Sequence, residues 1–479
     1  MVNIKLEQDK FFKEKSYVFD LIFSTLGIEY KFIKDLNSLK DDDLLIYYGK
    51  DFEENISVNH IFIKDSSKLF NENYLLCEPD YNVKTFKLKN KIKNIEDIIS
   101  IFNNGNEFIN INNKSVYIYS DLISDIFFMV TRYEEVILEY KDNHERFLLE
   151  KSLAYKYNFL NRPIVNEQIE FIFDIIKSLD GNIKRKNRLN DKEFIFFLSH
   201  DIDSIFKYND KFIRSLAIKL IKEKSLKNTL NYLSKATKVF INKDKDPFWS
   251  FKYLLELENK YNINASYYFM SGGTSNKDNY YNIDNKNLRS IFEEIKNNNS
   301  EIGIHGSYNS YNDYNLLNSE INKLKKYYSI VGIRQHYLRF SAPETWEIHE
   351  KTGLTYDTSL GFAKLAGFRG GICTPYKPFN IKEKKVINVY EIPLVVMDGT
   401  ICDKEYMNLN KEQALEYVKD LIQRIKNVNG IFSFLWHNSS LDKENYWGEW
   451  IDFYEDILKY SSDKALSISG EKIIGLYKK

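Results

Sequence analysis

The sequence predicts an α/β protein made of two domains. The chain has 479 residues, more than one average core accommodates, and 43% of them are hydrophobic, which is enough for two sizeable cores. A polar, basic segment at residues 179–194 marks the boundary between a domain at residues 1–185 and another at 193–479. After this boundary, short apolar strands alternate with amphipathic helices, which is typical of a βα barrel or a doubly wound sheet.

The N-terminal domain is expected to be a smaller α/β unit. Apolar runs at residues 43–49 (DLLIYYG) and 60–65 (HIFIKD) predict strands of one sheet. Residues 120–140 show helical spacing, and Ser120 is the expected N-cap of that helix.

The second domain continues the alternation of strands and helices. Strands are expected over residues 193–203, 263–270, 300–306, 332–340, 390–399 and 430–438. Helices are expected over residues 248–262, 287–299, 317–331 and 410–428. In such folds the chemistry gathers at the C-terminal ends of the strands.

Composition excludes several classes of function. The 68 Lys and Arg balance 68 Asp and Glu, so the whole chain has no electrostatic preference for nucleic acid. The three cysteines, Cys77, Cys373 and Cys402, are widely spaced without a CxxC pair, which argues against a disulfide framework and a thiolate zinc site. We find no signal peptide and no apolar run near the ~20 residues of a membrane span, so a cytoplasmic protein is expected.

Histidines gather where the predicted strands end. The chain has seven, of which His200, His305 and His437 lie at C-terminal strand ends and His336 lies on a fourth strand. A single histidine at a strand end is usually structural. Three of them, beside two acids, favour a functional site.

The first of these strands, in FFLSHDIDS, ends in Asp201 and Asp203. Residues two apart on a strand face one side, roughly 6.6 Å from each other. Two such carboxylates repel unless a divalent ion holds one and leaves the other free as a base. The alternative is a solvated strand end. A glycosidase also uses two carboxylates, about 5–5.5 Å apart in retaining enzymes, but it has no need of His305 and His437.

The order of these motifs resembles the polysaccharide deacetylases of the NodB-homology type, which are similar to carbohydrate esterase family 4, over residues 193–440. SHDID resembles their first motif, which implies that Asp201 is the general base and Asp203 a metal ligand. EIGIHGSYNS resembles the second motif and implies His305 as a ligand, but Asn309 stands where the family has a second histidine. Asn309, His200 or water would then complete the metal site, or metal binding has weakened.

The later motifs imply further roles. GIRQHYLRF offers Arg334, and less well Arg339, as the arginine that holds the base by ion pairing, and His336 there is as easily packed as catalytic. Asp357 is expected to orient the acid histidine or to shape the site. Arg369 would either reach an anionic group of the substrate or form a structural salt bridge.

The last motif, FSFLWHNSS, implies a methyl pocket and a general acid. Leu435 would line the pocket for the acetyl methyl group, and His437 would protonate the leaving amine. Arg339, Asp357, Arg369 and Leu435 are thus the expected substrate-binding residues.

The resemblance implies a distorted (β/α) barrel that removes an N-acetyl group from a sugar of a glycan or a lipid-linked precursor. The expected cofactor is a divalent metal, Zn²⁺ or otherwise Co²⁺, Ni²⁺ or Fe²⁺. Two alternatives stay open. One is another metal-dependent C–N hydrolase on the same barrel, and the other is a non-catalytic glycan-binding relative.

Two segments add expectations about partners. Residues 207–245 hold eleven Lys or Arg against three acids with helical apolar spacing, so this insertion could rest on an anionic membrane; a solvated helical pair is the favoured alternative. In the first domain, IFFMVTRYEE, HERF and RPIVNE are similar to a domain that precedes some of these deacetylases, and the likeness implies no chemistry of its own. The sequence indicates no oligomeric state.

Overall fold

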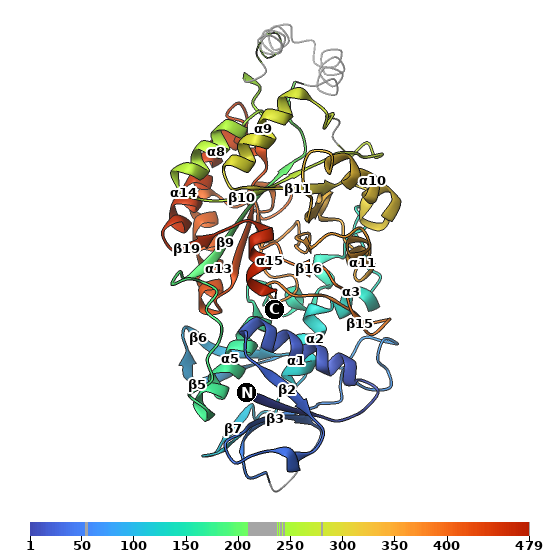
Figure 1. Ribbon diagram of the computed structural model, residues 1–479, viewed down its shortest axis with the longest axis vertical. Coiled ribbons are helices and arrows are strands. Elements are labelled where there is room, and N and C mark those ends of the chain that lie inside the picture. The colour runs from blue at the N-terminus through green and yellow to red at the C-terminus, as the bar shows by residue number, and fades with distance from the viewer. Residues whose placement is uncertain are drawn as a thin grey trace.

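The computed structural model confirms the predicted α/β fold class. It describes residues 1–52, 56–208, 237, 239, 242, 245–278 and 281–478. One large sheet is built from strands within the first 118 residues, and a second one from strands between residues 194 and 467. Figure 1 shows the two along the long axis of the molecule, with the barrel above the N-terminal unit. Residues 180–193 between them form neither helix nor strand.

The N-terminal sheet has six strands in the order β2-β1-β3-β4-β8-β7. Its strands are β1 (Val2–Leu6), β2 (Tyr30–Ile33), β3 (Leu44–Gly49), β4 (Asn59–Lys64), β7 (Ile109–Ile111) and β8 (Ser115–Ile118). All pairs are parallel except β7 with β8. Every residue of β3 is buried, as expected for a strand of a parallel sheet that is covered on both faces.

Helices α1 (Phe12–Leu26), α2 (Leu122–Val130) and α5 (Ile164–Leu179) pack together in this half, with the hairpin β5 (Lys84–Ile92)–β6 (Ile95–Ser100) beside them. The short helices are α3 (Tyr133–Ile137) and α4 (Leu153–Lys156). The single helix expected over residues 120–140 is therefore wrong: α2 ends before Arg132, whose left-handed backbone (φ +54°) starts α3 in a new direction. Asp121, not Ser120, is the N-cap, and its side chain accepts a hydrogen bond from the Ser124 N–H.

The barrel sheet has nine strands, and eight of them follow the path β16-β13-β12-β11-β10-β9-β18-β17, with β19 against β9. They are β9 (Phe194–Ile202), β10 (Ala265–Phe269), β11 (Glu301–Gly306), β12 (Gly332–Gln335), β13 (Tyr356–Asp357), β16 (Tyr390–Glu391), β17 (Val396–Met397), β18 (Ile431–Leu435) and β19 (Ala465–Ser467). Every pair is parallel. The path begins at β16 and ends at β17, so the barrel is distorted and open between these two short strands.

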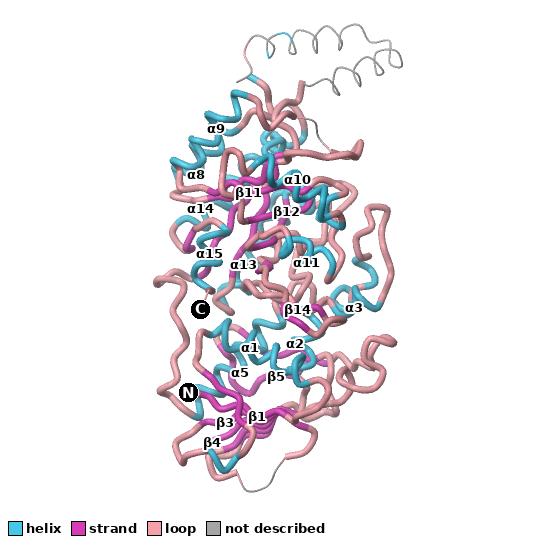
Figure 2. The backbone as a smooth tube through the Cα atoms, turned by 45° about the vertical axis from the view of Figure 1, so that its right-hand side comes forward, coloured by secondary structure: helices cyan, strands magenta, loops and turns pink. Residues whose placement is uncertain are grey.

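Helices surround this sheet, as Figures 1 and 2 show. They are α8 (Phe251–Lys260), α9 (Lys286–Asn297), α10 (Tyr314–Leu324), α11 (Glu344–Lys351), α12 (Asp398–Cys402), α13 (Lys411–Asn427), α14 (Ile451–Ser462) and α15 (Gly470–Tyr477). A hairpin of β14 (Phe379–Asn380) and β15 (Lys385–Val386) lies on the side of the N-terminal unit. The strand expected over residues 332–340 stops at Gln335, and an irregular turn over His336–Leu338 follows it.

The two units pack against each other through apolar and charged side chains. The ring of Phe379 lies 4.9 Å from that of Tyr17 and 5.7 Å from that of Phe127. The Tyr17 hydroxyl donates a hydrogen bond to the Lys377 carbonyl at 2.9 Å. The N-terminal unit therefore forms a joint core with the barrel.

Most of the basic segment predicted at residues 207–245 lies outside the described residues. Within the described part of the chain, no helix combines the length and the apolar composition that a membrane crossing requires.

Candidate functional site

A cavity of about 440 Å³ opens at the C-terminal ends of the barrel strands. Because β9, β11, β12 and β18 are parallel, their C-terminal ends lie at one edge of the sheet. The titratable residues that line the cavity are Arg146, Asp201, Asp203, Lys277, His305, His336, Tyr337, Asp398, Tyr406 and His437. Three predicted strand ends thus converge on one cavity, each with a histidine or an acid.

The side chains at the end of strand β9 point to two opposite faces of the sheet. Asp201 and Asp203 line the cavity. His200 points to the other face, as alternation along a strand requires, and is fully buried there. Its Nδ1 lies 2.6 Å from the Trp436 carbonyl oxygen and its Nε2 lies 3.1 Å from Glu258 Oε1. Both ring nitrogens of His200 are occupied, so His200 packs the barrel and is not available to a metal in the cavity.

Asp203, His305 and His336 form a group that could hold a metal ion. Asp203 Oδ1 lies 3.1 Å from His305 Nε2 and 3.6 Å from His336 Nε2, and the three ligand atoms lie within 4.8 Å of one another. Ligand atoms bound to one Zn²⁺ at about 2.0–2.2 Å lie within about 4 Å of each other, so small movements would bring all three onto one ion. Asp203 Oδ1 and His305 Nε2 are also buried atoms without a hydrogen-bond partner, as unfilled ligand atoms would be.

An acceptor holds the outer nitrogen of each imidazole, so the neutral form of each ring presents its inner nitrogen as an acceptor. His305 Nδ1 lies 2.9 Å from the Arg334 carbonyl oxygen, and His336 Nδ1 lies 3.2 Å from Asp278 Oδ1. Because these partners only accept, both Nδ1 atoms carry the proton, and neutral rings would direct their Nε2 lone pairs at Asp203. Histidine ligands of metals are held in this way by a carboxylate or a carbonyl.

The charges of the group favour a cation. Burial raises the pKa of Asp203, but His336, His305 and His437 outweigh burial and hold it below its ordinary value. Burial likewise lowers the pKa of His305, and Asp201 and Asp203 more than reverse this. The protein therefore concentrates ionised carboxylate where positive charge can gather.

His437 faces this group from β18 and is held by an acid. Its Nδ1 lies 2.8 Å from Asp398 Oδ1, and its backbone N–H donates to Asp398 Oδ2 at 2.8 Å. Its Nε2 points into the cavity and lies 3.9 Å from Asp203 Oδ2. Burial disfavours the imidazolium, but Asp398, Asp203 and Asp201 outweigh it and raise the pKa of His437 to about 10. His437 therefore faces the metal group from the opposite side of the cavity, with Asp398 behind it.

Asn309, predicted as a metal ligand, lies elsewhere. Its side chain is exposed, its Oδ1 accepts from Arg339 Nη1 at 3.2 Å, and its Nδ2 donates to Thr274 Oγ1 at 3.4 Å. The second histidine beside Asp203 and His305 is instead His336, which follows the next strand, β12. The sequence prediction gave Asn309, His200 or water as the remaining metal ligand, and treated His336 as a residue that is as easily packed as catalytic.

The two arginines expected beside the base both have other partners. Arg334 is buried, and its Nη2 donates to Ser199 Oγ at 3.0 Å, one step deeper on the same face of β9 as Asp201. Among the described residues, no ion pair of 4.0 Å or less joins Arg334 to Asp201, so the expected pairing is absent. Arg339 binds the His144 carbonyl and Glu145 and does not line the cavity, which corrects its expected contact with substrate.

The remaining predicted substrate residues lie behind the cavity wall. Asp357 accepts from Ser359 and lies 3.3 Å from His349 Nδ1; the acid that orients His437 is Asp398, so that expectation for Asp357 is wrong. Arg369 forms a two-point salt bridge with Glu135, at 2.9 and 2.7 Å, which is the structural alternative.

Leu435, expected to line a methyl pocket, is fully buried. It packs with Leu338 and Ala363, which do line the cavity. Leu338 and Ala363, and not Leu435, therefore supply apolar surface to the cavity.

Three residues in or beside the cavity were not predicted from the sequence. Asp398 follows an apolar strand in PLVVMDGT, the same signal that identified Asp201, and this signal could have found it. Asp278 lies in a polar, Asn-rich loop, and nothing in its neighbourhood marks it. Arg146 comes from the N-terminal unit, which was expected to take no part in chemistry, yet it lines the cavity.

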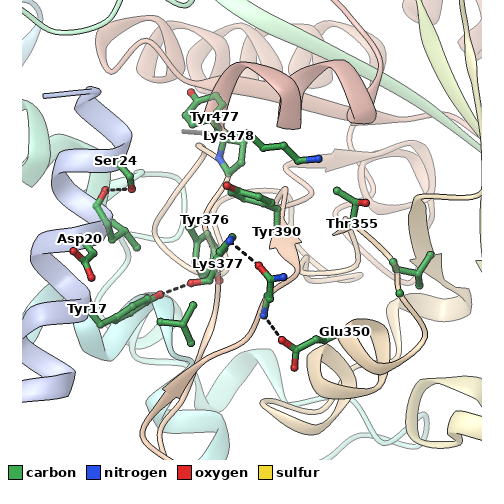
Figure 3. Close-up of a pocket in the computed structure, with 16 residues that line it drawn as sticks. Tyr17, Asp20, Ser24, Glu350, Thr355, Tyr376, Lys377, Tyr390, Tyr477 and Lys478 are labelled. Atoms are coloured by element: carbon green, nitrogen blue, oxygen red, sulfur yellow. Dashed lines mark hydrogen bonds between the residues drawn. The ribbon is translucent and has the colours of Figure 1, made fainter. Parts of the chain in front are cut away.

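A larger cavity of about 780 Å³ lies between the two units (Figure 3). Tyr17, Asp20 and Ser24 of α1 face Tyr477 and Lys478 at the chain end across it. None of the described residues that line it is a histidine or a cysteine. The smaller cavity, with its convergent imidazoles and acids, is therefore the candidate functional site.

Comparisons with known proteins point to one family model and several solved structures. A model described as a family of unknown function (DUF7033) matches residues 4–180. A search of curated proteins finds no match.

Among solved structures, the chain is similar to a Mycobacterium smegmatis protein described as a polysaccharide deacetylase, with 13% identity and a TM-score of 0.40 over 60% of this chain and 92% of that one. A Pseudomonas aeruginosa PAO1 protein described in the same way has 14% identity and a TM-score of 0.40, over 60% and 91%. Puue allantoinase has 13% identity and a TM-score of 0.38, over 60% and 91%.

Proposed function

We propose that this protein is a metal-dependent hydrolase of C–N amide bonds that removes the N-acetyl group from a sugar of a glycan or of a lipid-linked glycan precursor. One observation carries the proposal. Asp203, His305 and His336 converge on one point, and His437 faces them across the same cavity.

Asp203, His305 and His336 would hold the metal. One carboxylate and two imidazoles suit Zn²⁺, and Co²⁺, Ni²⁺ and Fe²⁺ accept the same donors. When bound, such an ion lowers the pKa of water towards about 7 and polarises the acyl carbonyl.

Asp201 is placed to act as the general base. Its Oδ1 is buried and has no hydrogen-bond partner, and its Oδ2 lies 3.8 Å from His305 Nδ1. A carboxylate with a free oxygen beside the metal group can accept the proton of the attacking water.

His437 then supplies the proton that the leaving group needs. An amine cannot leave as an anion, so its nitrogen must be protonated as the C–N bond breaks. Asp398 fixes the ring of His437 through Nδ1 and leaves Nε2–H directed into the cavity. The proton taken by Asp201 and the one given by His437 balance over the reaction.

The cavity wall suits a sugar. Tyr337, Tyr406 and Trp447 line it beside the apolar Leu338 and Met397. Aromatic faces pack against the apolar faces of sugar rings, and a volume of about 440 Å³ lies within the usual range for small-ligand sites.

Acetate release from N-acetylglucosamine oligomers, measured with the purified protein before and after chelation, tests the proposal. Asp201→Asn and His437→Ala should each lower the rate about 10²–10⁴-fold. The matched control is His60→Ala, because His60 is also a buried histidine but belongs to the N-terminal unit. It should leave the rate unchanged.

Metal analysis separates hydrolysis from simple binding of glycans. The proposed function predicts stoichiometric metal and loss of acetate release with EDTA. A protein that holds no metal and binds glycan equally well with EDTA or with added Zn²⁺ would instead be a non-catalytic relative.

A further inference from the structure

The residues that follow the metal-site histidine His336 have an unusual backbone. Tyr337 and Leu338 both adopt the left-handed region, with φ of +62° and +52°. Residues other than glycine rarely do so, and such conformations persist only where the surrounding structure holds them. Both residues line the catalytic cavity, so the position of the cavity wall depends on what holds this segment.

A tight turn of the N-terminal unit contacts this segment. Lys141 and Phe147 form an antiparallel bridge, and Asp142 Oδ1 accepts from the N–H groups of His144 and Arg146 at 2.8 and 3.0 Å. These bonds make residues 141–147 a defined hairpin, referred to below as the docking hairpin.

Arg146 of the docking hairpin binds the strained segment directly. Its Nη1 donates to the Tyr337 carbonyl oxygen at 3.0 Å, while its Nε donates to Asp142 Oδ2 at 2.8 Å. Only 10% of the Arg146 side chain and 16% of the Asp142 side chain are exposed, so water competes little for these bonds. The planar guanidinium can serve both partners at once because its donors diverge in a fixed fork.

Further contacts fasten the same loop on its other side. The ring of His144 lies 4.8 Å from that of Tyr337. Arg339 Nε donates to the His144 carbonyl at 2.8 Å and its Nη2 to Glu145 Oε2 at 3.0 Å. The loop from His336 to Arg339 is therefore tied to the docking hairpin at Tyr337 and at Arg339.

We propose that Arg146 is a positioning residue of the metal centre: it holds the Tyr337 carbonyl and thereby keeps the adjacent His336 directed at Asp203. The N-terminal unit is then a working part of the site, because it supplies the hairpin that fixes a ligand of the barrel. This inference rests on the proposed function, in which His336 binds the metal.

Calorimetric titration of Zn²⁺ into the full-length protein, after chelation and removal of the chelator, tests the role of Arg146. Loss of a group that orients a metal ligand typically costs about 10–100-fold in metal affinity, and we expect a loss of that size for Arg146→Ala. The matched control is Arg162→Ala. Arg162 is also a mostly buried arginine of the N-terminal unit that is paired with acids, Glu167 and Asp97, but it lines no part of the catalytic cavity. Its loss should leave Zn²⁺ affinity as in the wild type.

Arg146→Lys covers the case in which Arg146→Ala does not fold. Lysine can pair with Asp142 but lacks the fork that serves Asp142 and the Tyr337 carbonyl together, so its Zn²⁺ affinity should fall between those of the wild type and the alanine variant. With Co²⁺ in place of Zn²⁺, the visible absorption should change in the lysine variant if His336 is displaced.

The outcomes separate this inference from the proposed function. Wild-type Zn²⁺ affinity in the folded Arg146 variants would overturn the inference and leave the metal site standing. A raised KM with unchanged Zn²⁺ affinity would also overturn it, because Arg146 would then contact the substrate. A wild-type protein without Zn²⁺ affinity would instead remove the proposed function itself.

Discussion

At the C-terminal edge of the N-terminal sheet, Asp65 follows β4 and accepts from the buried Lys15 Nζ at 2.9 Å and from the Ser67 N–H at 2.7 Å. At the corresponding edge of the barrel, Asp203 follows β9, and its Oδ1 has no hydrogen-bond partner although it lies 3.1 Å from His305 Nε2. Both sheets thus place an acid at a strand end. In the first sheet the acid is satisfied by the protein, and in the second it faces a cavity of about 440 Å³.

The comparison shows which feature of a charged strand end indicates function. Buried polar atoms in folded proteins are nearly always paired, because an unpaired one costs free energy. An acid whose partners are all supplied by the chain stabilises the fold. A carboxylate oxygen without a hydrogen-bond partner, beside imidazole nitrogens that face the same cavity, is expected to gain its partners from a metal or a substrate.

The largest contrast is predicted between Asp203→Asn and Asp65→Asn. Asp203→Asn removes the carboxylate ligand, and since a catalytic metal is worth several kcal/mol in the transition state, the rate should fall about 10³-fold or more. Asp65→Asn takes one of two carboxylates from the buried Lys15 and should lower the free energy of unfolding by about 3 kcal/mol. Urea unfolding, acetate release and bound metal measure the two effects.

Each of these two variants also serves as the control of the other. Asp203→Asn should keep its unfolding midpoint close to that of the metal-free wild type, and Asp65→Asn should keep its bound metal while folded. If Asp65→Asn lost metal without loss of stability, the distinction between the two edges would be mistaken.

The next contrast concerns two buried acids of the barrel, Asp398 and Asp357. Asp398→Asn should lower kcat about 10²–10⁴-fold, because His437 loses the acid that orients it and stabilises its charge. Asp357→Asn is the matched control, since Asp357 pairs with His349 behind the cavity wall. Metal content should be unchanged in both variants, and an equal fall in kcat in both would contradict the assignment.

A third prediction concerns the pH dependence of stability. The pKa of His437 is raised to about 10 in the fold, above its ordinary value of about 6.5, so its stabilising contribution is complete below about pH 6.5 and is lost as the pH rises towards 10. In EDTA, the free energy of unfolding of the wild type should therefore fall relative to His437→Asn between pH 7 and 9, by up to about 1.4 kcal/mol per pH unit. A difference between the two proteins that stays constant over this range would show that His437 is not charged in the fold.

The sequence predicted those parts of the site that depend on local pattern. Asp201, Asp203, His305 and His437 all lie at or just after the C-terminal ends of apolar strands, and a parallel sheet brings such ends together whatever the details of the fold. Strand β9 was predicted to within one residue at each end because its apolar run is long and wholly buried.

The parts that failed depend on the register between strands and on contacts between the two units. Whether Asn309 or His336 faces Asp203 depends on where β12 stops, which the apolar pattern of residues 332–340 does not reveal. Arg334 donates a hydrogen bond to Ser199 instead of forming an ion pair with Asp201, because its side chain lies deeper in the barrel than Asp201. The contact of Arg146 with the cavity joins residues 191 positions apart in the chain, and no local pattern can indicate it.

The smallest effect is expected for Asn309, one of the candidates that the sequence offered for the last place in the metal site. Asn309→Ala removes an exposed amide that bonds Arg339 and Thr274, so Zn²⁺ affinity should change by less than about threefold. His336→Ala, at the position that the structure puts in its place, should weaken Zn²⁺ binding far more, because it removes one of three ligands. Calorimetric titration of both variants decides between the two positions. If Asn309→Ala lost as much affinity as His336→Ala, the amide would have to swing from Arg339 into the cavity when metal binds, and His336 would be a supporting residue.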